Sequence, residues 1–255
     1  MSDPISHDPD AVPAKRADQL GFRPKRFWKA SSVETQGDGF AIKLDGRSVK
    51  TPGGAVLVVP SRALAGHIQA EWDAVTSHVH FEDMPLTRLG FAAIDRMGAT
   101  LDETVAEALR YAETDLLAYP SDYPEALIAR EAQAWKPLLD WAAGEELVFH
   151  QNTSLIHKPQ PADTLERLDT LIRGLSIYER AGLMSAVPLF GSIVLAVALW
   201  KGRIGGEDAF AASRVGEDFQ AETWGRDAEA SQRAESMKKQ SFSLQLWFDS
   251  LRAQD

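Results

Sequence analysis

Residues 181–200 read AGLMSAVPLFGSIVLAVALW and form the one long run of the chain without a charged residue. About 20 consecutive apolar residues can span a bilayer, so a transmembrane helix is one interpretation. Glycines, serines and Pro188 dilute the run, and charged residues flank it on both sides. A helix that is apolar on all sides also suits the centre of a large helical domain. We therefore expect a buried hairpin or central helix, with Pro188 opening a second helical segment.

Composition and charge narrow the possible classes of function. The chain has 255 residues, with 37 Asp and Glu against 27 Lys and Arg, and a net charge of −10. An acidic surface repels phosphate backbones, which disfavours nucleic-acid binding. The chain has no cysteine, which excludes disulfides, thiol nucleophiles and thiolate metal sites. The length and composition indicate a globular protein of one large domain or two smaller ones.

The first 24 residues differ from the rest in composition. They are rich in Asp, Pro and Ala and contain almost nothing large enough to bury, so we expect a mobile leader over residues 1–24. The segment lacks the apolar core of a secretory signal and is too acidic for a mitochondrial transit peptide. The bacterial cytoplasm is therefore the expected compartment.

Residues 25–90 consist of short segments separated by turn residues. Segments such as FAIKL (40–44) and AVLVV (55–59) alternate with Gly-containing turns, among them Asp45-Gly46. An Asp-Gly pair favours a two-residue hairpin because Gly accepts a positive φ. We expect an antiparallel meander that curls into a small barrel or docks on a helix. That helix is predicted to begin at Pro60-Ser61, and its apolar residues recur at helical spacing: Leu64, Ile68, Trp72 and Val75.

From Pro85 onward the patterns are helical. Thr100 and Glu103 predict a capping box at the start of a helix over residues 101–114. Further helices are expected at about residues 124–143, 162–173, 176–202, 206–223 and 226–252, with glycines between several of them. The predicted class is α+β: a small antiparallel β-rich N-terminal domain (25–90) followed by a larger all-α C-terminal domain (91–255).

One segment is a candidate metal site. Residues 77–87, SHVHFEDMPLT, look extended, and in a strand His78, His80 and Glu82 would share one face, as the ligands of a small metal-dependent hydrolase could. The same three residues also suit a solvated strand face. The chain has no phosphate-binding loop, nucleophile elbow or H-E-x-x-H motif. We therefore expect no enzyme activity and no cofactor.

Acidic residues cluster around Trp224 late in the chain: Glu217, Asp218, Glu222, Asp227 and Glu229. On a helix, Glu217 shares a face with Ala221 and Trp224. Three interpretations stay open: a solvated face, a paired-carboxylate acid/base site, and a surface on which a carboxylate beside an aromatic anchor engages a basic group of another protein. The partner-binding interpretation selects four residues, which are Glu217, Phe219, Trp224 and Asp227.

Four segments in order resemble a known family. They are FWKASSVETQGDGFAIKLDGRSVKTP (27–52), VPSRALAGHIQAEWDA (59–74), MPLTRLGFAAID (84–95) and EDFQAETWG (217–225). Together they resemble the assembly chaperones that serve the alpha subunit of F-type ATP synthase in mitochondria and alphaproteobacteria. The resemblance extends from about residue 26 to residue 235.

The resemblance implies a binding protein without catalysis. It implies binding to the newly made alpha subunit, protection from aggregation until the beta subunit replaces the chaperone, and no need for nucleotide or membrane insertion. The expected compartment is the bacterial cytoplasm, or the mitochondrial matrix if the chain is eukaryotic. Glu217 matches the glutamate most associated with function in the family, although Gly216 and Asp218 depart from the glutamate-rich form of that segment. We expect the motif residues Asp45, Gly46 and Thr51 to form turns, and Trp72 to belong to the core.

Overall fold

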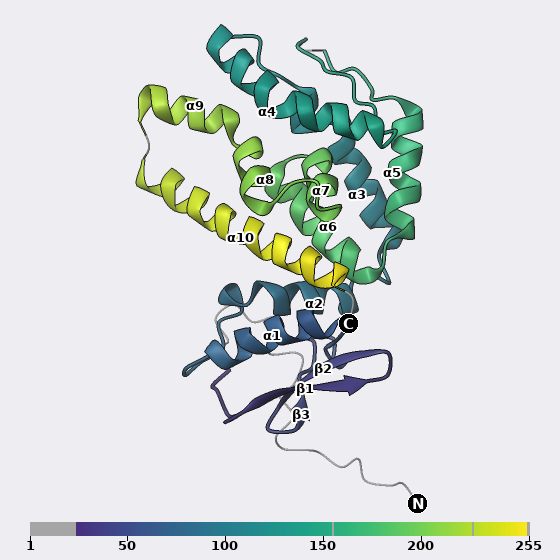
Figure 1. Cartoon of the computed structure of the whole chain (residues 1–255), viewed down its shortest axis with the longest axis vertical. Helices are drawn as coiled ribbons and strands as arrows, with labels where there is room; N and C mark the ends of the chain where they lie inside the picture. The colour runs from purple at the N-terminus through teal and green to yellow at the C-terminus, as the bar shows by residue number, and fades with distance from the viewer. Residues whose placement is uncertain (1–23, 155, 226, 254–255) are drawn as a thin grey trace, which may run out of the picture.

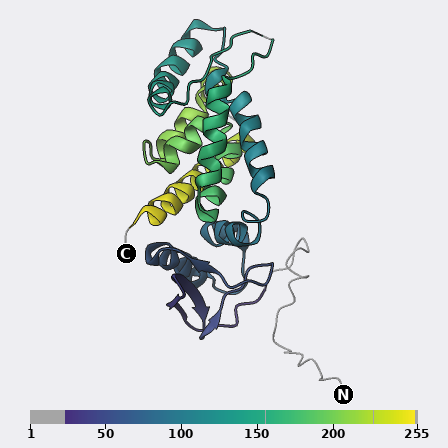
Figure 2. The same ribbon diagram turned by 90° about the vertical axis from the view of Figure 1, so that its right-hand side faces the viewer.

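The computed structural model describes residues 24–154, 156–225 and 227–253. The leader expected over residues 1–24 lies outside the described residues, apart from its last position. Figure 1 and Figure 2 show a small sheet at one end of an elongated molecule, with most of the helices beyond it. The predicted class, an α+β protein with an antiparallel sheet ahead of a larger helical part, is confirmed.

The sheet has four antiparallel strands arranged around β2. Their bounds are β1 Ser31–Gln36, β2 Gly39–Leu44, β3 Arg47–Ser48 and β4 Val58–Val59. β1 pairs with the whole of β2, whereas β3 and β4 pair with different residues of β2. The sheet is therefore not the simple meander that we expected, because β4 pairs with β2, two strands earlier in the chain. The predicted turn at Asp45 and Gly46 is confirmed, since both residues have a positive φ, 48° and 82°.

Two helices cover the sheet and separate it from the remaining helices (Figure 1). α1 Arg62–Ala74 begins at the predicted N-cap, where the Ser61 hydroxyl accepts a hydrogen bond from the Leu64 amide at 3.1 Å. α2 Pro85–Asp95 begins with proline, whose missing amide proton costs nothing at this position. The apolar residues predicted to face the core of this region are buried: Leu64, Ile68, Trp72 and Val75.

Two carboxylates of the motif segments connect these elements. Glu71 of α1 accepts hydrogen bonds at 2.8 Å from the Leu86 and Thr87 amides and at 2.7 Å from the Thr87 hydroxyl, so it caps the start of α2. Burial raises the pKa of Glu71. At the other end of α2, Asp95 accepts hydrogen bonds from the Thr51 hydroxyl at 2.6 Å and the Gly53 amide at 2.8 Å. Both carboxylates therefore fix the orientation of α2 on the sheet.

We predict that Glu71→Ala lowers the free energy of unfolding by about 1–3 kcal/mol, because two amides at the start of α2 lose their acceptor in a partly buried place. Denaturant unfolding followed by circular dichroism measures the change. Glu107→Ala, at an exposed position of a different helix, is the control and should stay within about 0.5 kcal/mol of the parent. Equal effects of the two substitutions would contradict the capping role.

The remaining helices follow in the order α3 Leu101–Glu113, α4 Glu125–Gly144, α5 Ala162–Gly174, α6 Ile177–Phe190, α7 Ile193–Trp200, α8 Gly206–Ser213, α9 Val215–Trp224 and α10 Ala228–Arg252. Short 3-10 helices occur at Phe81–Asp83 and Leu116–Ala118. The helix expected over residues 206–223 is two helices, which meet at Arg214.

The apolar run of residues 181–200 occupies the centre of the helical part, as predicted. It forms parts of two helices, but the break between them is not at the predicted position. Pro188 lies inside α6 and does not open a second segment. The break comes at Gly191, which has a φ of 63°, and Ser192 caps α7 by accepting a hydrogen bond from the Leu195 amide at 3.1 Å. All of α7 except Trp200 is buried. Within the described residues, no helix has the length and apolar character needed to cross a membrane.

The predicted capping box at Thr100 is wrong. The Thr100 hydroxyl donates to the Arg96 carbonyl at 2.9 Å and makes no capping bond with α3. A threonine hydroxyl can donate a hydrogen bond to the backbone carbonyl four residues earlier, and here this bond forms in place of the helix cap. A capping box does form at the start of α6, between Ser176 and Glu179.

The boundary predicted between residues 90 and 91 stays a prediction. Both residues lie within α2, and one cluster of buried side chains runs from Trp28 in the sheet region to Phe248 in α10. At Gly90 an added Cβ would lie 2.8 Å from Cδ1 of Leu57, so α2 approaches β4 closely at this point. The sheet region and the helical part therefore share a continuous core.

Candidate partner-binding site

α9 and the first half of α10 form a helical pair with little burial. No residue of α9 is buried, and none of residues 228–240 in α10 is buried either. The second half of α10 is fixed to α6, because Trp247 Nε1 donates to the Tyr178 carbonyl at 3.0 Å and Gly182 leaves room for the Phe248 ring. α10 is thus anchored at its end and exposed at its beginning (Figure 1).

A sharp reversal joins the two helices. Gly225 ends α9 with a φ of 91°, which L side chains rarely adopt. Asp227 begins α10, and its carboxylate accepts a hydrogen bond from the Ala230 amide at 2.6 Å. The predicted helix stop at Gly225 is confirmed, and one oxygen of Asp227 is used in capping.

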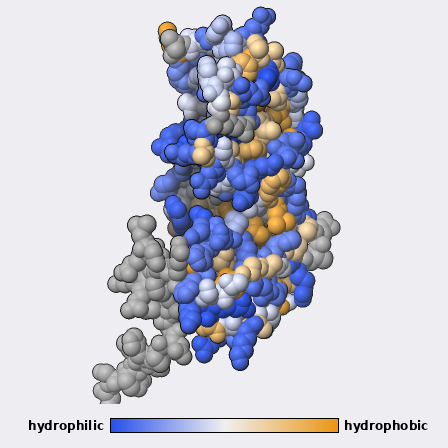
Figure 3. All heavy atoms as spheres, turned by 90° about the vertical axis from the view of Figure 1, so that its left-hand side faces the viewer, coloured by the Kyte–Doolittle hydropathy of each residue, from blue (hydrophilic) through white to orange (hydrophobic). Residues whose placement is uncertain are grey.

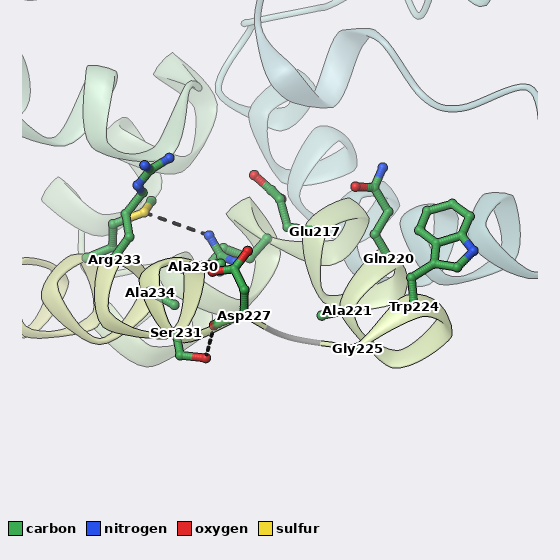
Figure 4. Close-up of a pocket in the computed structure, with 12 residues that line it drawn as sticks. Glu217, Gln220, Ala221, Trp224, Gly225, Asp227, Ala230, Ser231, Arg233 and Ala234 are labelled. Carbon is green, nitrogen blue, oxygen red and sulfur yellow. Dashed lines mark hydrogen bonds between the residues drawn. The ribbon is translucent and has the colours of Figure 1, made fainter.

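A groove of about 380 Å³ lies between these helices (Figure 4). The side chains that line it from α9 are Glu217, Gln220, Ala221 and Trp224. Those that line it from α10 and its cap include Asp227, Ala230, Ser231, Ala234 and Met237. The alanines leave the space open, and its size is within the range of pockets that bind small molecules or a few side chains.

Three of the four predicted binding residues lie at this groove, and the fourth does not. Glu217, Trp224 and Asp227 line it, but Phe219 packs towards α4, where the Arg130 guanidinium lies 5.1 Å from the centre of its ring. Arg130 also pairs with Glu222 at 2.6 Å. Phe219 and Glu222 therefore attach α9 to α4, and a partner-binding role for Phe219 stays a prediction.

Glu217 and Trp224 are the charged and the aromatic side chain that α9 contributes to the groove. The Glu217 carboxylate is exposed and, within the described residues, receives no hydrogen bond or ion pair. Trp224 is 79% exposed. A large aromatic side chain and a carboxylate on the same helix face are side chains that protein interfaces use as anchors. The geometry therefore suits recognition of another polypeptide.

Apolar side chains are also exposed farther along α10, where Phe242 is 43% and Leu246 is 37% exposed. Figure 3 shows the face that carries the α9–α10 turn, and apolar atoms gather near its middle within a largely hydrophilic surface. Exposed apolar area of this kind is typical of protein-binding faces.

Three residues at the groove were not predicted from the sequence. Arg214, Arg233 and Met237 line the groove. Arg214 lies three residues before Glu217, so helical spacing could have indicated it. Arg233 and Met237 belong to the next helix, and no local pattern predicts which face of α10 turns towards α9.

The candidate metal site is wrong. The strand expected for residues 77–87 is absent: His78 forms an isolated bridge with Lys25, and the chain then enters the 3-10 helix Phe81–Asp83. The alternation that would place His78, His80 and Glu82 on one face is therefore lost. Among the described residues, no group of three or more His, Asp or Glu side chains is arranged to hold a metal ion.

The fold and the groove define an α+β protein with an exposed helical surface suited to binding another protein. Residues 25–143 match the family described as ATP12 chaperone protein. The chain belongs to the ATP12 chaperone family, as its motif segments predicted. The groove lies beyond the residues of that match.

Individual relatives extend the similarity over most of the chain. The crystal structure of Atp12 from Paracoccus denitrificans is 36% identical, with a TM-score of 0.84 that covers 90% of this chain and 99% of that one. A mutant of the same bacterial protein matches equally, with 98% of its chain covered. Protein atp12, mitochondrial, of Schizosaccharomyces pombe is 28% identical over 220 residues, which are 81% of this chain and 75% of that protein.

Proposed function

We propose that this chaperone serves the assembly of F-type ATP synthase and that it binds the unassembled alpha subunit of the catalytic head. Membership of the ATP12 chaperone family supports a chaperone role. The observation that carries the binding proposal is the exposed Glu217 carboxylate, which has no partner among the described residues, together with the exposed Trp224 on the same face of α9. We propose this pair as part of the client-binding surface.

The physical need for such a chaperone follows from oligomer assembly. A subunit of an obligate oligomer exposes a large apolar interface before its partners arrive, and such surfaces aggregate. A groove of about 380 Å³ is far smaller than a subunit interface, so it serves as an anchor while other exposed surface covers the client. Displacement by the beta subunit can then release the client, and nucleotide is not required.

The direct test is an aggregation assay with isolated alpha subunit of the same organism. We predict that near-stoichiometric chaperone suppresses light scattering of the alpha subunit without ATP, because binding removes its apolar interface from solution. Isolated beta subunit is the matched client for specificity, and serum albumin is the control for nonspecific protection. Unchanged scattering, together with the absence of a complex in size-exclusion chromatography, would contradict the proposal.

We propose no catalytic role and no cofactor, since the family is named for chaperones and the candidate metal ligands form no metal-binding group among the described residues. The proposed client also indicates the compartment. The catalytic head is assembled in the bacterial cytoplasm or the mitochondrial matrix, and the relative from Schizosaccharomyces pombe is named as mitochondrial. Cell fractionation tests this assignment, and recovery of the protein only with membranes would contradict it.

A further inference from the structure

Arg214 is a largely buried cation at the inner end of the groove. It joins α8 to α9, and its side chain is 12% exposed. It lines the groove opposite Met237, whereas Trp224 lies at the far end beside the turn. Arginine stays charged at any physiological pH, so a positive charge is held in a place with little water.

The hydrogen-bonding capacity of this guanidinium is mostly unused. Among the described residues its one hydrogen bond goes from Nη1 to the Met237 sulfur at 3.8 Å, and a thioether is a weak acceptor. Nε is buried and has no hydrogen-bond partner in the part of the chain that the structure describes. The Asp218 carboxylate approaches Nε only to 3.9 Å, beyond hydrogen-bond range, and the Phe210 ring centre lies 5.8 Å from Cζ.

A buried arginine with only a weak acceptor is costly, because a charged group removed from water needs strong hydrogen bonds and an opposite charge in return. The protein itself supplies the Asp218 carboxylate, within ion-pair range but outside hydrogen-bond range, and the face of the Phe210 ring, and neither makes parallel hydrogen bonds to the planar guanidinium. A carboxylate fits that fork with two parallel hydrogen bonds. The unused donors therefore favour a ligand that brings a carboxylate into the groove.

We infer that Arg214 is an anion-binding residue of the α9–α10 groove and takes an Asp or Glu side chain of the bound polypeptide. The inference rests on the proposed function, since the polypeptide is the alpha subunit. Glu217, three residues later in the first turn of α9, takes a basic side chain of the same segment. The groove thus recognises a segment in which an acidic and a basic residue lie close together, with apolar contact at Trp224.

This pairing gives the groove selectivity through charge. A segment with basic residues alone would satisfy Glu217 but would cover Arg214 without an acceptor, which opposes binding. A segment with acidic residues alone would meet repulsion from Glu217 and Asp227. The groove therefore binds a segment that carries both an acidic and a basic residue more tightly than an exposed apolar segment that carries neither.

The test compares Arg214→Met with the parent, using isolated alpha subunit as the probe in a binding titration. We predict an affinity loss of about 30-fold, because removal of one partner of a desolvated charge pair mainly increases the dissociation rate. Arg214→Lys keeps the charge but not the fork, and it should recover only part of the affinity. Arg167→Met is the matched control, since the Arg167 side chain is 49% exposed, pairs with Glu146 and lies on α5, outside the groove.

A peptide array tests the inference on the unaltered chaperone, whose folding is not in question. Overlapping peptides of the alpha subunit are probed with the unaltered chaperone, and each Asp or Glu of a retained peptide is replaced by Asn or Gln. We expect one replacement to abolish most retention, and Arg214→Met chaperone to retain the original and replaced peptides equally. Full-strength binding by Arg214→Met, or retention indifferent to every acidic residue, would overturn the inference alone. Failure of the unaltered chaperone to bind alpha subunit would overturn the proposed function and this inference with it.

Discussion

Asp115→Ala is expected to lower the free energy of unfolding by about 3–5 kcal/mol, because it removes a shared acceptor from several donors in the centre of the protein. Asp115 is completely buried. Its carboxylate accepts hydrogen bonds from the Leu117 amide at 2.9 Å, the Ser192 hydroxyl at 2.9 Å and the Val194 amide at 3.0 Å. It therefore connects the 3-10 helix Leu116–Ala118 to the start of α7, and alanine would leave these donors unpaired.

The same carboxylate should give the stability a pH dependence. Burial raises the pKa of Asp115 from 3.8 to about 6, although hydrogen bonds from Val194 and Leu117 oppose the shift. Between these values the folded protein retains the proton and the unfolded chain releases it. The stabilisation that comes from this retained proton is therefore complete below about pH 4 and is lost as the pH rises through about 6, whereas the hydrogen bonds to the carboxylate remain.

Two variants separate these effects in denaturant unfolding measured from about pH 4 to pH 7. Asp115→Asn keeps the shape but cannot titrate, so the stability difference between parent and variant should change by up to about 3 kcal/mol across this range, in favour of the parent at low pH. Asp122→Ala, at an exposed position, is the control and should cost less than about 0.5 kcal/mol. Equal losses at positions 115 and 122 would refute the connecting role of Asp115.

Glu217→Lys should have the largest effect on client binding. We expect an affinity for alpha subunit about 100-fold lower, because the substitution replaces attraction to a basic client group by repulsion. Folding should be unaffected, since the Glu217 carboxylate is exposed and has no partner among the described residues. Scattering assays with alpha subunit and thermal unfolding measure the two properties separately.

The matched control for this substitution is Glu107→Lys on α3, which makes the same charge change at another exposed position. Glu217→Gln should give a smaller loss, because it removes the attraction without adding repulsion. If Glu217→Lys protects alpha subunit as well as the Glu107 control does, then Glu217 is not part of the binding surface. A large fall in melting temperature would instead assign its carboxylate a structural role.

Local patterns predicted much of the fold. Asp-Gly placed a hairpin turn, Ser61 placed the start of α1, and the helical spacing of Leu64, Ile68 and Trp72 predicted a buried face. These features depend on neighbours a few residues apart, so sequence is sufficient to predict them. Pro188 was misleading because α6 continues through it, and the packing around α6 and α7 outweighs the local preference of proline to begin a helix.

The sequence by itself determined the order of sheet and helices, the family, and the shared helical face of Glu217 and Trp224, since each depends on short spacings or local turn chemistry. Only the tertiary structure decided that this face borders a groove. The reversal at Gly225 sets α10 beside α9 and brings Met237 to Arg214, 23 positions apart in the chain. The burial of the Arg214 guanidinium against a weak acceptor arises from that packing, because burial depends on residues distant in sequence.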